Sequence, residues 1–332
     1  MLHTMRTRTA SFATALALAV ALLMVVPATG AAAAKRASSG CGKRAVAGAT
    51  NQHVTVDGTD REYLLAIPDN YDPAKPAPLV FDFHGLGSNM QEQSLYSRLD
   101  DQAGERGYVV ITPNGQGSVL RHWSLVPATT ANPDVAFTQA MLRTTNRALC
   151  IDQQRVFSTG ISNGAMFSTL LACALPGRLA AIAPVAGINA TEVCAAGTPR
   201  VSVLAFHGTA DPIVPYAGGA YFSGAPIGRA LGVPTAKPVD DAAAAWAAFD
   251  GCGSPPAQSF VADDVQHLVW PDCPPSGAVQ LYRVIGGGHT WPGSAAVRAD
   301  RLGATTASID ATKLMLDFFA AHPRKVASAG RV

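Results

Sequence analysis

Short apolar runs alternate with helix-like stretches along most of the chain. The apolar runs predict strands at 62–68, 78–85, 108–115, 155–160, 179–187, 201–208 and 279–289. The central runs are almost continuously apolar, which is typical of strands that helices bury on both faces. Between the strands, helices are predicted over 90–106, 134–149, 164–175, 239–250 and 308–321. This alternation predicts an α/β fold with a mostly parallel central sheet and helices on both faces.

The N-terminal pattern has a different character. Arg6 and Arg8 precede an apolar run over 12–26, and small residues follow it. This order predicts a signal peptide over 1–34 that is cleaved between Gly30 and Ala34. A membrane anchor is the alternative, but the run is shorter than the roughly 20 residues that span a bilayer. We therefore expect a secreted, extracellular protein with no membrane attachment after cleavage.

The remainder of the chain shows neither an internal repeat nor a Pro/Ser-rich linker. We expect a flexible mature N-terminus over 35–50, a single α/β domain over 51–322 and a C-terminal tail over 323–332. The Gly- and Pro-rich segment 217–238 is predicted to be a surface loop or a partial lid. We expect the mature protein to be a monomer.

Charge and cysteine content narrow the possible partners. The formal net charge is +2, and no basic run is interleaved with aromatic residues, so nucleic-acid binding is not expected. In an exported protein, six cysteines predict three disulfides. Their order along the chain suggests the pairs Cys41–Cys150, Cys173–Cys194 and Cys252–Cys273, although six cysteines allow other pairings. There is no C-x-x-C and no close Cys/His pair, so no metal site is expected.

A serine stands between two glycines in the segment Gly160-Ile161-Ser162-Asn163-Gly164. The segment joins a predicted strand to a predicted helix, and such a turn raises a serine hydroxyl above the sheet. The helix N-terminus behind Ser162 favours a developing oxyanion. The pattern alone is weak, because an ordinary glycine-rich turn has the same composition. The strand-turn-helix setting favours Ser162 as a nucleophile.

An acid and a base follow Ser162 in the order that serine hydrolases of this topology require. Asp211 lies in a loop after the predicted strand 201–208, and His289 ends the predicted strand 279–289. Both therefore belong to the sheet edge where Ser162 lies, which is where open α/β sheets bind ligands. A turn aspartate and a flexible surface histidine are the alternatives. Their joint occurrence predicts the catalytic triad Ser162, Asp211 and His289.

An oxyanion hole requires two backbone N–H groups. The residue after the nucleophile supplies one, which predicts Asn163, and a loop after an earlier strand supplies the other, which predicts Leu86. His84 and His207 each precede a glycine at a strand end. We expect both to fix loops by hydrogen bonds rather than to act as catalytic bases.

Aromatic residues flank the predicted active-site rim. Trp123, Tyr216 and Trp291 are candidate substrate-binding residues because a ring there could stack on a phenolic acid or line a polyester groove. The alternative for each is an anchor in the core or in a loop.

Four motifs in this order resemble the secreted polyhydroxybutyrate depolymerase and feruloyl esterase family of α/β-hydrolases. They are "HGLGS", "TGISNGAMFSTLLACALPGRLAAIAPVAG", "VLAFHGTADPIVPY" and "GGGHTWPG". The resemblance covers 50–321 and implies an α/β-hydrolase fold, the triad above, no cofactor and hydrolysis of small or polymeric carboxylic esters outside the cell. Ala165 stands where many relatives have glycine, and Leu86 follows "HG" where many have cysteine or glutamine. Both differences affect the expected acyl pocket.

Together these features predict a secreted serine esterase that acts through an acyl-enzyme. One alternative is a peptidase of the same fold, which would usually carry an added propeller or cap domain. The other is a non-catalytic binding protein on a hydrolase scaffold, which would usually have lost a member of the triad. The natural ester is left open by the sequence.

Overall fold

The computed structural model describes residues 1–2, 37–126, 131–221, 235–295 and 299–325. The predicted signal peptide lies outside the described residues except for its first two, and so does the 222–234 part of the predicted loop. The chain divides into two units, 1–35 and 36–332, and the fold below is that of the second. Within the described ranges, no helix is long and apolar enough to cross a membrane.

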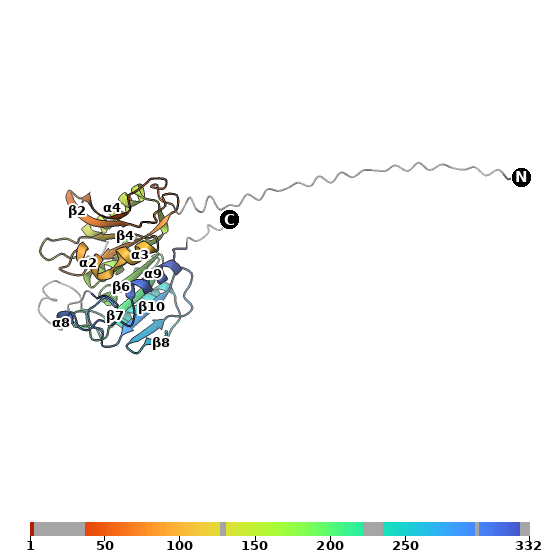
Figure 1. The fold of residues 1–332 in the computed structure, drawn as a ribbon. Coiled ribbons are helices and arrows are strands. Elements are labelled where there is room, and N and C mark those ends of the chain that lie inside the picture. The colour runs from red at the N-terminus through yellow and green to blue at the C-terminus, as the bar shows by residue number, and fades with distance from the viewer. Residues whose placement is uncertain (3–36, 127–130, 222–234, 296–298, 326–332) are drawn as a thin grey trace. The chain divides into compact units, whose positions relative to one another are not determined.

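Ten strands form one sheet in the order β1-β2-β4-β3-β5-β6-β7-β10-β9-β8 (Figure 1). The middle six, from β4 to β10, pair in parallel, and the strands at both edges pair antiparallel. This arrangement confirms the predicted mostly parallel sheet. The strands are β1 (Gly48–Val56), β2 (Thr59–Ile67), β3 (Ala77–Phe83), β4 (Val109–Pro113), β5 (Ile151–Ile161), β6 (Ala181–Val185), β7 (Ser202–Gly208), β8 (Ala257–Ala262), β9 (Val265–Val269) and β10 (Val279–Val284).

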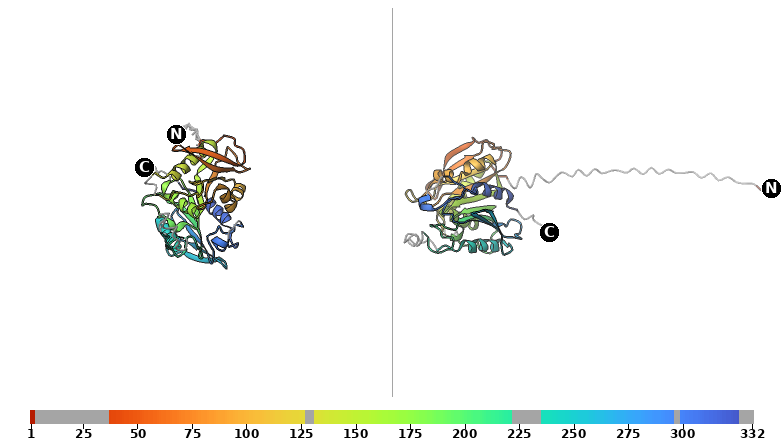
Figure 2. Two further views of the ribbon diagram at one scale, coloured as in Figure 1. Left: turned by 90° about the vertical axis from the view of Figure 1, so that its left-hand side faces the viewer. Right: turned by 60° about the horizontal axis from the view of Figure 1, so that its bottom comes forward.

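Helices cover both faces of the sheet. They are α2 (Met90–Ser97), α3 (Leu99–Glu105), α4 (Pro133–Ala148), α5 (Asn163–Ala174), η1 (Ile188–Ala190), α7 (Val239–Asp250), α8 (Ala299–Leu302) and α9 (Ala311–Ala321). Helices α4, α5 and α7 share one apolar core with the sheet, and α3 and α9 share another. Figure 2 shows this part of the chain from two further directions.

Alternation along the buried strands explains the two cores. In β7, Val203 and Ala205 belong to the core with α5 and α7, whereas Leu204 and Phe206 belong to the core with α9. Successive side chains of a strand point to opposite faces. In a strand that is buried on both faces, every position therefore favours an apolar residue. That is why these strands are continuous apolar runs in the sequence.

The edges of the sheet and the N-terminal segment differ from the sequence prediction. Strands β1, β8 and β9 were not predicted, because β1 and β8 are mostly exposed and lack an apolar run. Residues 37–50 were expected to be loose. Instead, Ala37 bridges to Asp152 and the Ser38 N–H donates to the Ile151 carbonyl at 3.0 Å. Strand β1 also begins before residue 51, so this segment is part of the folded unit.

Candidate active site

Ser162 lies on a strained turn between β5 and α5. Its φ of 57° and ψ of −124° are unusual for a residue that carries a side chain. A Cβ at Gly160 or Gly164 would lie 2.4 or 2.1 Å from the Phe83 carbonyl oxygen, so only glycine fits at either position. The Ser162 N–H donates to the Val185 carbonyl on β6 at 2.9 Å. This geometry is that of a nucleophile elbow.

Asp211 and His289 are joined by a short hydrogen bond. His289 Nδ1 donates to Asp211 Oδ2 at 2.7 Å, which leaves Nε2 of the same ring as the basic nitrogen. Asp211 Oδ1 accepts from the N–H groups of Ile213 and Val214, each at 2.8 Å. Burial raises the pKa of Asp211, but the nearby His289 and His207 outweigh burial and hold this pKa below its usual value. Asp211 is therefore ionised and fixed against His289.

The three predicted triad residues follow strands whose carboxyl ends share one edge of the sheet. Ser162 follows β5, Asp211 follows β7 and His289 follows β10, and these strands lie in the parallel order β5-β6-β7-β10. Within the described part of the chain, the Ser162 hydroxyl makes no hydrogen bond to His289. In enzymes without bound substrate, catalytic hydrogen bonds are often long or misaligned and tighten when the substrate binds.

Two free backbone donors accompany Ser162. Leu86 and Asn163 line the same cavity as Ser162, and among the described residues no hydrogen bond uses either N–H. Asn163 is the first residue of α5, so its N–H has no partner within the helix. The positive end of the helix dipole lies at the same point. An oxyanion formed on Ser162 would meet donors of the kind that stabilise it.

His84 fixes the loop that carries Leu86. Its Nδ1 donates to the Gly85 carbonyl at 2.7 Å, and its Nε2 accepts from the Gly115 N–H at 2.9 Å. Burial lowers the pKa of His84 to about 4, so the ring is neutral at physiological pH. Both ring nitrogens are engaged with backbone groups, as a structural histidine requires.

A cavity of about 1200 Å³ opens at Ser162. One face of α5 forms its wall, because Ser162, Met166, Leu170 and Cys173 all line it and recur at helical spacing. This volume is slightly above the roughly 300–1,000 Å³ that is usual for ligand sites. The cavity can hold an acyl group considerably larger than acetate.

Comparison with known proteins identifies the family. No family model matches the chain. Feruloyl esterase C of Emericella nidulans is 33% identical over 238 residues, which cover 69% of this chain and 83% of that enzyme. The chain belongs to the feruloyl esterase family of carboxylic ester hydrolases. A second member, the probable feruloyl esterase C of Aspergillus flavus, is 34% identical over 192 residues, or 55% of this chain and 65% of that protein. The match thus spans slightly less than two thirds of that second relative.

A solved structure supports the fold of this feruloyl esterase family member. Acetyl xylan esterase from Aspergillus awamori superposes with a TM-score of 0.54 at 18% identity, over 76% of this chain and 96% of that one. At this identity the likeness concerns the fold alone. Together with the parallel sheet and its flanking helices, it shows the α/β-hydrolase fold.

The three aromatic candidates have different positions in this family member. Trp123 lines the cavity, although its side chain is almost wholly buried. Trp291 is only 1% exposed, and its indole N–H donates to Thr312 Oγ1 at 2.9 Å. The Tyr216 hydroxyl donates to Asp240 Oδ1 at 2.6 Å. Neither Trp291 nor Tyr216 is among the residues that line the cavity, because each packs into the protein as an anchor.

The cysteines of this esterase form the three suggested pairs, Cys41–Cys150, Cys173–Cys194 and Cys252–Cys273. The second pair lines the cavity. In the ranges that the structure describes, no group of three or more His, Cys, Asp or Glu residues could hold a metal ion.

The partners of two side chains could not be predicted from the sequence. His207 Nε2 lies 3.4 Å from Asp211 Oδ2 and donates to the Val214 carbonyl at 2.9 Å. The Asn163 side chain pairs with the backbone of Trp123, 40 residues away along the chain. A motif can mark His207 as a structural histidine, but only the folded chain shows which carboxylate it faces.

Proposed function

We propose that this protein hydrolyses carboxylic esters by a two-step acyl transfer at Ser162. His289 Nε2 takes the hydroxyl proton as Ser162 Oγ forms a bond to the ester carbonyl carbon. The N–H groups of Leu86 and Asn163 stabilise the resulting oxyanion. When the intermediate collapses, its C–O bond to the alcohol breaks and His289 returns the proton to the leaving oxygen. Water then attacks the acyl-serine by the same route and releases the acid.

The elbow carries this proposal. Ser162 shares one cavity with two main-chain N–H groups that no described hydrogen bond uses. The His289–Asp211 hydrogen bond at 2.7 Å supplies the oriented base. We propose that substrate binding brings the Ser162 hydroxyl into hydrogen-bond contact with His289 Nε2.

Ferulate esters are the proposed substrate class. The relatives are named feruloyl esterases, and a cavity of about 1200 Å³ has room for a methoxyphenol ring. Oligomers of hydroxybutyrate are the competing class that the sequence motifs also allow. We propose further that the protein is exported, since three disulfides are typical of oxidising compartments. We also propose that it acts as a monomeric single-domain enzyme.

Ester hydrolysis is tested with methyl ferulate and hydroxybutyrate oligomers on the wild type and on Ser162→Ala. We expect the wild type to prefer methyl ferulate and the variant to lose at least about 10,000-fold in kcat. Ser168→Ala is the matched control, because Ser168 lies on the same helix with its hydroxyl buried against Ser158. We expect this variant to remain active. A serine-directed organophosphate should add mass at Ser162 alone. Turnover that persists in Ser162→Ala would contradict the mechanism, and a lack of turnover in both proteins would favour a binding protein.

A further inference from the structure

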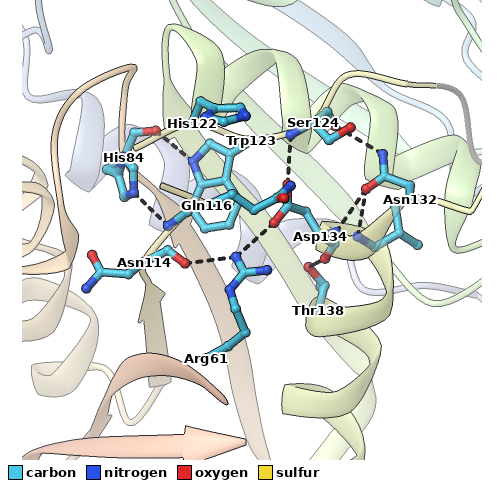
Figure 3. Close-up of polar contacts among 12 residues, drawn as sticks. Arg61, His84, Asn114, Gln116, His122, Trp123, Ser124, Asn132, Asp134 and Thr138 are labelled. Carbon is cyan, nitrogen blue, oxygen red and sulfur yellow. Dashed lines mark hydrogen bonds and ion pairs between the residues drawn. The ribbon is translucent and has the colours of Figure 1, made fainter. Parts of the chain in front are cut away.

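A buried ion pair anchors the loop between β4 and α4. Arg61 Nη2 lies 2.8 Å from Asp134 Oδ1, with side chains 9% and 0% exposed. The other carboxylate oxygen of Asp134 accepts from the Ser124 N–H and from Gln116 Nε2, each at 2.7 Å. Figure 3 shows these contacts converging on one carboxylate. Asp134 therefore holds two points of the loop, Gln116 and Ser124, on either side of Trp123.

Trp123 lies in the segment that the carboxylate holds, and it contacts both elements that carry the oxyanion donors. Its main-chain N–H donates to Asn163 Oδ1 at 2.7 Å, and Asn163 Nδ2 donates to its carbonyl at 3.1 Å. Its indole N–H donates to the His84 carbonyl at 2.9 Å, as Figure 3 also shows. His84 stands two residues before Leu86. One residue therefore joins the Asn163 side of the hole to the Leu86 side.

The indole itself is packed rather than presented to a ligand. Its ring stacks on Phe167 at 5.3 Å and meets Phe83 edge-on at 4.9 Å, measured between ring centroids. The side chain is only 1% exposed, so neither ring face is free for stacking on a substrate. Its hydrogen bonds and its packing both act on the protein.

We propose that Trp123, held by the Arg61–Asp134 pair, is a positioning residue that sets the separation of the Leu86 and Asn163 N–H groups. This inference rests on the proposed function of those groups. Oxyanion donors act through preorganisation, and small displacements of catalytic groups are costly. A buried polar network whose members are satisfied is rigid enough to hold them. Trp123 acts on the transition state through Asn163 and His84.

The test compares Trp123→Phe with Trp246→Phe. The control tryptophan is also fully buried, but it lies in α7 and its indole nitrogen has no hydrogen-bond partner in the described structure. We expect Trp123→Phe to lower kcat about 10- to 100-fold with little change in KM. Its affinity for a boronic acid that mimics the tetrahedral intermediate should fall in parallel. Trp246→Phe should alter the melting temperature only.

Several outcomes overturn the inference. A raised KM with unchanged kcat would mean that the indole contacts substrate. Equal kcat losses in the two variants would mean a general packing effect. An inactive wild type would instead contradict the proposed function. These results are distinguishable because kcat, KM and boronic-acid affinity are measured on the same preparations.

A second variant keeps the test independent of how well Trp123→Phe folds. Asp134→Asn retains the volume of the side chain but removes the charge that holds Arg61, Gln116 and the Ser124 N–H. We expect a loss in kcat that is not additive with that of Trp123→Phe, because both changes act through one network. Strictly additive losses would show that the ion pair and Trp123 act separately.

Discussion

The buried His207 side chain contacts both ends of the turn that carries Asp211. Its Nε2 donates to the Val214 carbonyl and faces Asp211 Oδ2 at 3.4 Å, while the Val214 N–H donates to the other oxygen of the same carboxylate. The His207 ring also meets Tyr216 edge-on, with ring centroids 5.7 Å apart. His207 thus closes the turn that aims Asp211 at His289.

Replacing His207 with Leu or Gln separates hydrogen bonding from packing. Glutamine keeps an N–H donor at a similar distance from the main chain, whereas leucine does not. We expect His207→Leu to lose about 10-fold in kcat/KM and His207→Gln to retain most of its activity, measured on methyl ferulate. Equal losses in both variants would show that the ring acts through its shape alone.

The sequence predicts well the residues whose positions in the fold follow from their order along the chain. Ser162, Asp211 and His289 each follow a strand, and that property is visible in the apolar pattern. For Trp123 the sequence allows both a substrate contact and an anchor, because it shows only an aromatic residue near the rim. Its actual partners, Asn163 and His84, depend on distances across the fold, which residue order does not contain.

The predicted helix over 90–106 is two helices, because the chain turns at Arg98. That residue has φ 55° and ψ 27°, and neither glycine nor proline marks the break in the sequence. Side-chain contacts to β3 accompany this break. The Asp82 carboxylate accepts from Gln93 Nε2 at 2.7 Å and from Ser97 Oγ at 2.6 Å, so the end of α2 is tied to the sheet. Periodicity cannot reveal such a constraint.

Asp82 makes the stability of the folded protein depend on pH. Burial raises its pKa to about 7 despite the hydrogen bonds from Ser97 and Gln93. The folded state therefore holds a proton that the unfolded chain releases near pH 4. The resulting stabilisation is complete below that pH and is lost as pH rises towards 7. We expect Asp82→Asn to gain up to about 4 kcal/mol over the wild type between pH 4 and pH 8.

Urea unfolding of the wild type and Asp82→Asn across this pH range measures the difference. Asp250, whose pKa burial also raises to about 7, is present in both proteins and cancels in the comparison. A difference that stays constant with pH would show that Asp82 titrates normally.

At the scale of the whole molecule, the N-terminal segment is fastened to the middle of the sheet. The Cys41–Cys150 disulfide spans 109 residues, and its second cysteine immediately precedes β5. The other two pairs each span 21 residues. The central strands were predictable because burial on both faces leaves an apolar run. The exposed edge strands β1 and β8 were not predictable, because they lack an apolar run and only their pairing with a neighbouring strand defines them.

Loop length predicts which disulfide contributes most to stability. In the chain-entropy description, a closed loop of 109 residues contributes about 5 kcal/mol and one of 21 residues about 3 kcal/mol. We therefore expect replacing both Cys41 and Cys150 with serine to lower the free energy of unfolding more than the same change at Cys252 and Cys273. Guanidinium unfolding measures both. A reversed order would contradict the entropic account.

Helix α5 places Ser162 at one end and Cys173 near the other, roughly 16 Å away along its axis. The proposed nucleophile and a disulfide that lines the same cavity therefore lie at opposite ends of one helix. A substitution at Leu170 changes the volume of the cavity at a distance from the first turn of the helix. We expect substitutions there to change the preferred acyl group and to leave the geometry at Ser162 intact.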